Sequence, residues 1–211
     1  RTNRWFDLSR NSFDPHCYAL KKGIKEGLSG DAFIERVGKI LAINKDMSVS
    51  KNVAEELGLG DIETKLNNYS YWAKVLPWDT NNINEKVKNF PLMVKKNRAM
   101  HNLDIESNDP DEIMRIDREY GIHSHAEQYE KIFSSIKQRG LLKSEKYGFM
   151  TAEILIKDGE YRWKPGSDGS HRTTLSAAMG FKKIPVIVDK IIRYEDLEYW
   201  PNVVNLTFSK K

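Results

Sequence analysis

Apolar and polar residues in the first sixty positions alternate with the spacing of short helices. Three stretches show this spacing, and they run from Pro15 to Leu28, from Asp31 to Ile43 and from Ser50 to Leu57. Asp or Ser stands at or just before the start of each stretch, and Gly follows the first and the last, as is typical of helix ends. We therefore predict a mainly helical N-terminal region.

The segment from Tyr71 to Asp79 departs from this pattern, because it holds three aromatic residues and a proline within nine positions. This composition favours a rigid, irregular segment with buried rings. We expect the rings to pack in the core, and a docking surface is the alternative interpretation.

Polar residues dominate between Pro91 and Tyr120, where Asp109-Pro110-Asp111 interrupts the apolar periodicity. The chain holds no internal repeat that would place a boundary elsewhere. We place the boundary between two domains in this region. The prediction is a helical region over residues 1–100 and a second domain over residues 101–211.

The clearest helical pattern lies at the start of this second domain. After Ser124 as a candidate N-cap, apolar side chains recur at helical spacing until Gly140, a candidate C-terminal stop. These apolar residues are Ala126, Tyr129, Ile132, Phe133 and Ile136. The pattern predicts an amphipathic helix.

Strand patterns follow this helix. Ala152 to Ile156 and Tyr161 to Trp163 are joined by a connection that contains Asp158-Gly159, a strong signal for a tight turn, and together they predict a hairpin. The apolar run from Ile184 to Val188 predicts a buried strand, with Pro185 near its start where a missing donor is tolerated. We therefore expect an α+β fold for residues 101–211.

Composition and charge restrict the class of protein further. The chain has 211 residues, of which 39% are hydrophobic and 30% charged, and its formal net charge is +4. A single cysteine, Cys17, excludes an intramolecular disulfide and favours a reducing, cytoplasmic compartment. Apolar runs of five residues or fewer are far too short for a membrane span, and the first 30 residues lack the apolar core of a signal peptide.

The basic surplus is confined to the first half of the chain and is dilute. Residues 1–100 carry 17 basic and 12 acidic side chains, whereas residues 101–211 carry 17 and 18. Nucleic-acid binding needs a denser basic surface, so we do not expect a nucleic-acid partner. The oligomeric state is left open.

The turn from Pro165 to Ser170 leads into a predicted helix and has the features of an anion site. Gly169 permits a sharp turn, and the first amides of the following helix direct partial positive charge at it. Arg172 is suited to bidentate contact with phosphate, Ser170 and Thr173 offer hydroxyls, and Asp168 offers a carboxylate. The alternative is an ordinary connection in which Asp168 caps the helix and Arg172 faces solvent.

Three sequence elements around this turn occur in the order found in one superfamily. They are Ser135-Ile-Lys-Gln-Arg-Gly-Leu141, then Asp168-Gly-Ser-His-Arg172 with Ala177-Ala-Met-Gly180, and then Ile184-Pro-Val-Ile-Val188. Together they resemble the ParB/sulfiredoxin superfamily over residues of about 117 to 192. The resemblance implies a ParB/sulfiredoxin-like domain that binds nucleotide phosphates through Gly169, Ser170, His171, Arg172 and Thr173.

Departures from the superfamily's patterns exclude two of its branches. Sulfiredoxins have a cysteine where this chain has Ser170, so we do not expect redox repair. Partition ParB proteins bind CTP through a Gly-Glu-Arg-Arg motif that is missing here, and we expect no helix-turn-helix domain in the 23 residues after Val188.

The branch that remains is the one with an Asp-Gly-x-His-Arg motif, which includes the free serine kinases, and this chain resembles it. Leu76-Pro-Trp78 and Tyr199-Trp-Pro-Asn202 also resemble ParB-like proteins associated with surface-polysaccharide biosynthesis.

This resemblance implies a phosphotransferase that uses ATP, or another nucleoside triphosphate, with Mg²⁺. The acceptor would be a hydroxyl of a sugar, polyol or amino acid. Asp168 would hold Mg²⁺ or receive the hydroxyl proton, and His171 would contact a phosphate or the acceptor. Glu119 would be the catalytic base, unless it forms a surface ion pair with Arg115 or Arg118. The alternative functions are a non-catalytic nucleotide-binding regulator and a DNA-associated ParB-like protein.

Three weaker patterns have structural explanations that we favour. His123 and His125 are conceivable zinc ligands, but their separation does not suit one helical face, so we expect surface or capping roles. His16 and Cys17 are conceivable as a nucleophile pair, but neighbours on a helix point in different directions. Residues 53–66 are weakly similar to a helix-turn-helix, and we expect packing helices instead.

Overall fold

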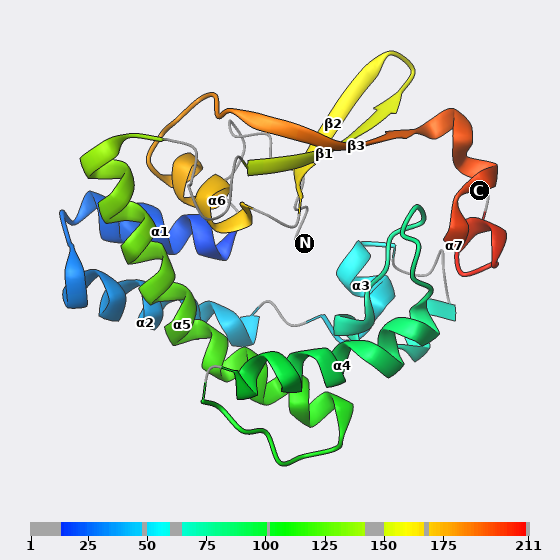
Figure 1. Cartoon of the computed structure of the whole chain (residues 1–211), viewed down its shortest axis with the longest axis horizontal. Coiled ribbons are helices and arrows are strands. Elements are labelled where there is room, and N and C mark those ends of the chain that lie inside the picture. The colour runs from blue at the N-terminus through cyan, green and yellow to red at the C-terminus, as the bar shows by residue number, and fades with distance from the viewer. Residues whose placement is uncertain are drawn as a thin grey trace. The chain divides into compact units, whose positions relative to one another are not determined.

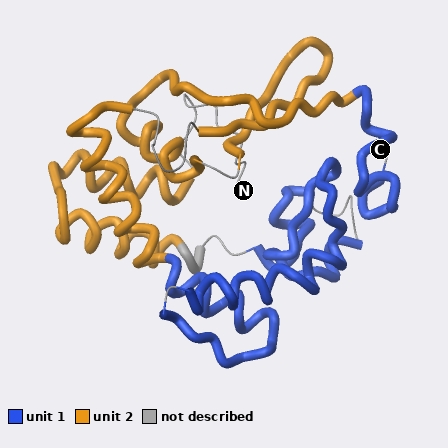
Figure 2. Tube along the Cα trace, in the orientation of Figure 1, with its two compact units in different colours: residues 1–2, 48–121, 195–211 blue, residues 3–47, 122–194 orange. Residues whose placement is uncertain are grey.

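The computed structural model describes residues 14–47, 50–59, 65–100, 102–141, 150–166 and 169–209. Two compact units make up the chain, and each combines separate stretches of sequence (Figure 2). Unit 1 holds residues 1–2, 48–121 and 195–211, and unit 2 holds residues 3–47 and 122–194. The two domains predicted from the sequence, over residues 1–100 and 101–211, stay a prediction.

Unit 2 contains the first two predicted helices. Helix α1 spans Pro15–Lys25, and its N-cap Asp14 accepts a hydrogen bond from the amide of His16. Helix α2 spans Gly30–Met47, four residues further than predicted. Both helices pack against the second half of α5, and the rings of Phe33 and Phe133 stack at a centroid distance of 5.1 Å in the core of this unit. The two helix predictions are confirmed.

Helix α5 spans Pro110–Arg139 and corrects the predicted start at Ser124. Asp109-Pro110-Asp111, interpreted as an interruption, is the beginning of this helix, because the Asp109 carboxylate accepts from the amide of Asp111 and Pro110 takes the first helical position. Ser124 therefore lies in the helix interior. The predicted end is confirmed, since Gly140 has a φ of 73° and donates to the carbonyl of Ile136.

A three-stranded sheet completes unit 2 (Figure 1). Strands β1 (Met150–Lys157) and β2 (Glu160–Pro165) form the predicted antiparallel hairpin, whose turn residues Asp158 and Gly159 have φ angles of 51° and 76°. Strand β3 (Val186–Arg193) runs parallel to β1, after helix α6 (Ser170–Ala178), so the strand order is β2-β1-β3. Helices together with this small mixed sheet confirm the α+β class.

The prediction of a buried strand at the apolar run near residue 186 is wrong in one respect. The strand exists, but Val186, Ile187 and Val188 are exposed by 36%, 52% and 44%. The physical reason is position, because β3 is an edge strand and no described element covers these side chains. An apolar run identifies a strand without specifying what packs on it.

Unit 1 is mainly helical. It contains α3 (Val53–Leu57), α4 (Ile83–Ala99), the first part of α5 and α7 (Pro201–Val204). Two 3-10 segments lie at Tyr71–Ala73 and Tyr194–Tyr199. The second of them begins at Tyr194, which is the last residue of unit 2. Helix α3 begins three residues later than predicted because Asn52, not Ser50, caps it. Helix α4 was not predicted, although Asn82 and Glu85 form a capping box at its start.

The irregular aromatic segment of unit 1 is buried, as predicted. Trp72 and Trp78 are 9% and 7% exposed. The indole of Trp72 donates to the carboxylate of Asp111, and the ring of Trp78 meets the edge of Trp200 at 5.2 Å. The core interpretation of this segment is confirmed. None of the described helices is long and apolar enough to cross a lipid bilayer.

Asn202 joins α7 to the loop that follows Trp72. Its side chain is fully buried, and Nδ2 lies 2.9, 3.0 and 3.1 Å from the carbonyl oxygens of Leu76, Asp79 and Asn81. The Asn202 amide also donates to the carbonyl of Pro77. The two N–H groups of one side chain are therefore shared among three backbone acceptors of the loop.

Replacing Asn202 with Ala leaves these carbonyls without their buried donor. We expect N202A to lower the free energy of unfolding by about 2 kcal/mol, because each neutral hydrogen bond contributes roughly 1 kcal/mol and unsatisfied groups add a penalty. Urea unfolding measures the change. The matched control is V204A, at an exposed position of the same helix, which should change stability by less than about 0.5 kcal/mol. Equal effects of the two substitutions would contradict this role of Asn202.

Candidate functional site

The connection from β2 to α6 is held tightly against the start of β1. The amide of Gly166 donates to the carbonyl of Thr151, and a Cβ at Gly166 would overlap the Thr151 hydroxyl. Gly169 has a φ of 120°, and a Cβ there would lie 2.8 to 3.1 Å from atoms of Met150. Glycine at both positions therefore lets the connection approach the strand and turn directly into the helix.

The N-cap residue of helix α6 has no side chain that could cap the helix. Gly169 is the N-cap, and its carbonyl accepts from the amide of Thr173 at 2.8 Å. The amides of Ser170 and His171 precede this bond and by helix geometry have no partner within the helix. They and the helix dipole form the positive end of α6, as predicted from the sequence.

The predicted phosphate contacts of α6 differ in how far they face the solvent. Ser170 is exposed, whereas His171 and Arg172 are half-buried. Thr173 is buried, and its hydroxyl donates to Sδ of Met150 at 3.6 Å, so this hydroxyl faces the interior. Asp168, the predicted metal ligand and proton acceptor, lies outside the described residues.

Three histidines and a tyrosine gather beside this helix start. We call His16 of α1, His125 and Tyr129 of α5, and His171 of α6 the histidine cluster. The ring of His171 lies 4.9 Å from that of His125 and 5.1 Å from that of Tyr129, between centroids. The hydroxyl of Tyr129 and Nδ1 of His16 are 3.1 Å apart. Three helices of unit 2 thus contribute polar rings to one place.

Burial in this cluster keeps His171 neutral. The pKa of His171 falls from 6.5 to about 4, first because burial penalises the charged ring and second because His125 is close. A neutral imidazole at physiological pH has one N–H donor and one acceptor nitrogen. His171 can therefore donate to a phosphoryl oxygen or accept from a hydroxyl without adding a charge.

Glu119, the predicted base, is exposed on α5 and pairs with Arg115 at 2.8 Å. This is the surface ion pair that the sequence offers as the alternative. Glu119 belongs to unit 1, whereas α6 belongs to unit 2.

Cys17 is not an activated nucleophile. Its side chain is fully buried on α1, and the pKa of the thiol is raised, chiefly by burial and also by Asp14, against a smaller lowering by Lys21. A protonated, inaccessible thiol is a poor nucleophile. The neighbouring His16 contacts Tyr129 instead. The preferred interpretation of this pair, without nucleophilic chemistry, is consistent with the structure.

His123 and His125 point to different surroundings. His125 lies in the histidine cluster, whereas Nε2 of His123 pairs with Glu127 at 3.2 Å on the exposed side of α5. In the described part of the chain, no three side chains of the kinds that bind metals are grouped to hold an ion. The two histidines therefore lie in different surroundings.

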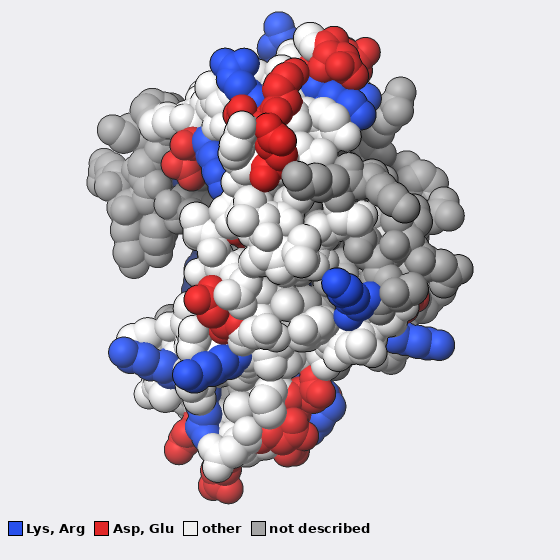
Figure 3. Space-filling model, turned by 90° about the vertical axis from the view of Figure 1, so that its right-hand side faces the viewer, with Lys and Arg blue, Asp and Glu red and all other residues white. Residues whose placement is uncertain are grey.

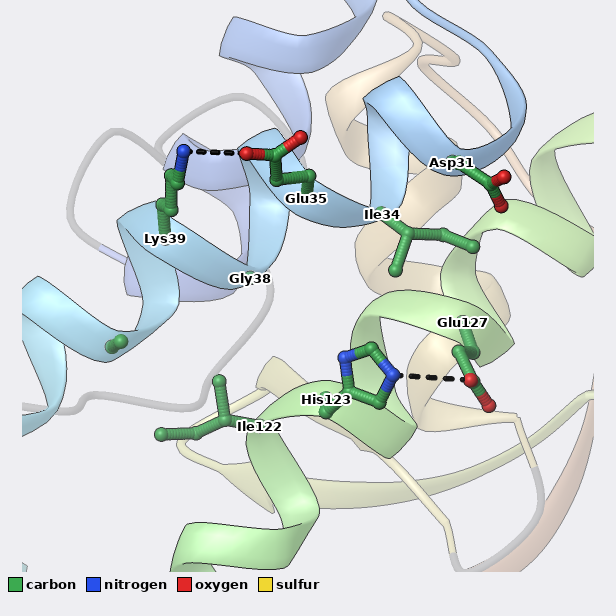
Figure 4. Close-up of a pocket in the computed structure, with 9 residues that line it drawn as sticks. Asp31, Ile34, Glu35, Gly38, Lys39, Ile122, His123 and Glu127 are labelled. Carbon is green, nitrogen blue, oxygen red and sulfur yellow. Dashed lines mark hydrogen bonds and ion pairs between the residues drawn. The ribbon is translucent and has the colours of Figure 1, made fainter.

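His123 lies instead at an open groove between α2 and α5 with a volume of about 560 Å³ (Figure 4). Ile34 and Ile122 line the groove together with Gly38. Four of the polar side chains at its rim form pairs on their own helices, Lys39 with Glu35 and His123 with Glu127. These pairs are exposed and contribute little energy. The groove is separate from the start of α6.

Charge on the surface is mixed. On the face drawn in Figure 3, basic and acidic side chains lie close to one another, with uncharged areas between them. Among the described residues on this face, no continuous basic surface appears.

The variant G169A tests the close approach of Gly169 to Met150 at the start of β1. We expect G169A to lower the free energy of unfolding by about 2 kcal/mol or more, because the new Cβ would clash with Met150 in addition to straining a positive φ. G180A is the matched control, since Gly180 has a φ of 85° with no atom within 4 Å of its would-be Cβ. The two values come from denaturant unfolding, and equal losses would show that the approach to β1 is unimportant.

The low pKa of His171 makes stability depend on pH. Below pH 6.5 the unfolded chain takes up a proton that the folded cluster resists, so stability is lost as the pH falls from 6.5 to about 4. We expect this loss to be about 2 kcal/mol smaller in H171Q than in the wild type. Urea unfolding at several pH values measures it. An unchanged slope in H171Q would contradict the burial effect.

Comparisons with known proteins do not identify a family. No model of a protein family matches the sequence, and no curated protein or solved structure is similar enough to count as a match. The ParB/sulfiredoxin resemblance therefore depends on the residues quoted for it, and it stays a prediction.

Proposed function

We propose that the start of α6 binds the phosphates of a nucleotide and that the protein transfers a phosphoryl group to a hydroxyl of a small molecule. The observation that carries this proposal is the start of α6 at the N-cap Gly169, where the amides of Ser170 and His171 adjoin the half-buried Arg172. Helix starts of this kind bind anions through amides and dipole together. Arg172 would add a guanidinium suited to phosphate.

The order of sequence elements supports a ParB/sulfiredoxin-like domain as the framework of this site. Within unit 2, a hairpin, a helix and a parallel strand follow one another, with the Asp-Gly-Ser-His-Arg motif at the helix start. By that resemblance the nucleotide is ATP, or another triphosphate such as CTP or GTP. The acceptor is a sugar, polyol or amino acid, and a role in surface-polysaccharide biosynthesis in the cytoplasm is part of the proposal.

Mg²⁺ is compatible with this arrangement. The ion commonly takes one or two carboxylates and completes its ligands with substrate phosphates and water, so a dedicated group of three protein ligands is not required. Asp168 would be the protein's ligand. When bound, Mg²⁺ would neutralise charge on the transferring phosphoryl group.

The residues of α6 would act mainly by position and charge. The amides and Arg172 would stabilise negative charge on the phosphoryl oxygens, which is most of what phosphoryl transfer requires. His171, neutral at physiological pH, would donate to a phosphoryl oxygen or orient the acceptor hydroxyl. Asp168 or Glu119 would receive the hydroxyl proton.

The ion pair of Glu119 favours a second candidate. Because its carboxylate is held by Arg115, it is not poised as a base in this conformation. A non-catalytic nucleotide-binding regulator would use the same start of α6 without needing a base. Such a regulator, including a DNA-associated one, predicts binding without turnover.

Phosphorus NMR separates the two candidates. The purified protein is incubated with Mg²⁺ and ATP, CTP or GTP, with and without serine and sugar alcohols. A phosphotransferase consumes the γ-phosphate signal and produces a phosphomonoester that depends on the acceptor. Nucleotide binding without a change in these signals supports the regulator, and the absence of any binding contradicts both.

Arg172 should be required for nucleotide binding. We expect R172A to weaken ATP binding at least tenfold in isothermal titration calorimetry, because a charge-assisted hydrogen bond to phosphate contributes roughly 1.5–3 kcal/mol. R162A is the matched control, since Arg162 is exposed on β2 and should leave the affinity unchanged. Equal affinity of R172A and the wild type would contradict the phosphate site.

A further inference from the structure

The outer strand β3 presents an apolar edge that no described element pairs with. In the sheet order β2-β1-β3, the described partner of β3 is β1. Ile187, Val188 and Ile191 are exposed by 52%, 44% and 56%. Edge strands in monomeric proteins are usually short, charged or covered, because an exposed apolar edge invites pairing with another strand.

A β-bulge gives this strand an unusual symmetry. Val188 is opposite Ala152 and Ile191 is opposite Ile154 on β1, with the extra residue Asp189 between these pairs. Because Ala152 and Ile154 are two apart, Val188 and Ile191 lie on one face of the sheet although they are three apart.

On the opposite face, Ile187 and Ile192 also lie on one side of the sheet, because they are opposite Thr151 and Leu155 on β1. Of these two, Ile187 is exposed, whereas Ile192 is already buried, with 4% of its surface exposed. Each apolar residue before Asp189 therefore has an apolar counterpart after Lys190 on the same face of the sheet, Ile191 for Val188 and Ile192 for Ile187.

This symmetry makes β3 complementary to an antiparallel copy of itself. A two-fold axis between Asp189 and Lys190, perpendicular to the sheet, places Val188 opposite Ile191 of the second copy and Ile187 opposite Ile192. It also places Asp189 opposite Lys190 of the second copy, twice in the dimer. Apolar residues thus meet apolar residues and opposite charges meet, which is the pairing that stabilises neighbouring strands.

We propose that two copies of this chain associate through antiparallel pairing of their β3 strands and so form a continuous six-stranded sheet. The arrangement buries the exposed apolar edge and satisfies its backbone groups in the way that strand addition does. It is an isologous interface, because the same residues contribute from both copies. The proposal is independent of nucleotide binding, since no residue of α6 takes part.

Charge reversal provides a test specific to this register. In D189K two lysines would face each other at each pair, and in K190D two aspartates would do so. We expect each variant to raise the dimer dissociation constant about tenfold, because like charges opposite each other destabilise paired strands. Sedimentation equilibrium measures this constant.

Two rescues then distinguish β3 pairing from any other dimer. An equimolar mixture of D189K and K190D restores opposite charges at both pairs, so a heterodimer should form where neither variant dimerises well alone. The double variant D189K/K190D should also dimerise like the wild type. Failure of both rescues would overturn the proposal.

An apolar variant completes the experiment. I187K places a charge in the apolar part of the interface and should produce monomers, whereas L92K makes the same kind of change at an exposed position of α4 and should leave the dimer intact. Circular dichroism confirms that each variant is folded. A wild-type protein that stays monomeric at its highest soluble concentration, or a dimer insensitive to I187K, would overturn the proposal.

Discussion

The close approach of Gly166 and Gly169 to the first residues of β1 is the constraint on which the candidate site depends. No side chain other than hydrogen fits at either position without moving Thr151 or Met150. This contact fixes where α6 begins, and therefore where its amides and Arg172 are directed. The burial of Thr173 against Met150 follows from the same contact, because the first turn of the helix lies directly on the strand.

The sequence predicts correctly those helices and turns that are determined by neighbouring residues in the chain. The hairpin turn at Asp158-Gly159 and the first two helices depend on turn residues and caps, and all were found. The start of α5 was missed because Asp109 and Pro110 were interpreted as a break, although Asp before Pro is also typical of a helix start. The exposure of β3 was missed because burial depends on partners distant in sequence.

The candidate site also has one part that the sequence predicts and one part that it does not. The start of α6 and its residues from Gly169 to Arg172 could be identified from glycine spacing and from the motif. The histidine cluster could not, because His16 and His171 come from helices more than a hundred residues apart in the sequence and no local pattern joins them. Only the burial of His171 in the folded unit, together with the nearby His125, reveals that this predicted contact is kept neutral.

The hydrogen bonds of Asn202 have a consequence for synthesis of the chain. Unit 1 needs Asn202 of α7 as a donor to the carbonyls of Leu76, Asp79 and Asn81, and α7 follows the last residue of unit 2 in the sequence. Unit 2 ends at Tyr194, so its whole sequence emerges earlier. Translation therefore delivers the described strands and helices of unit 2 before the α7 residues with which unit 1 closes its loop.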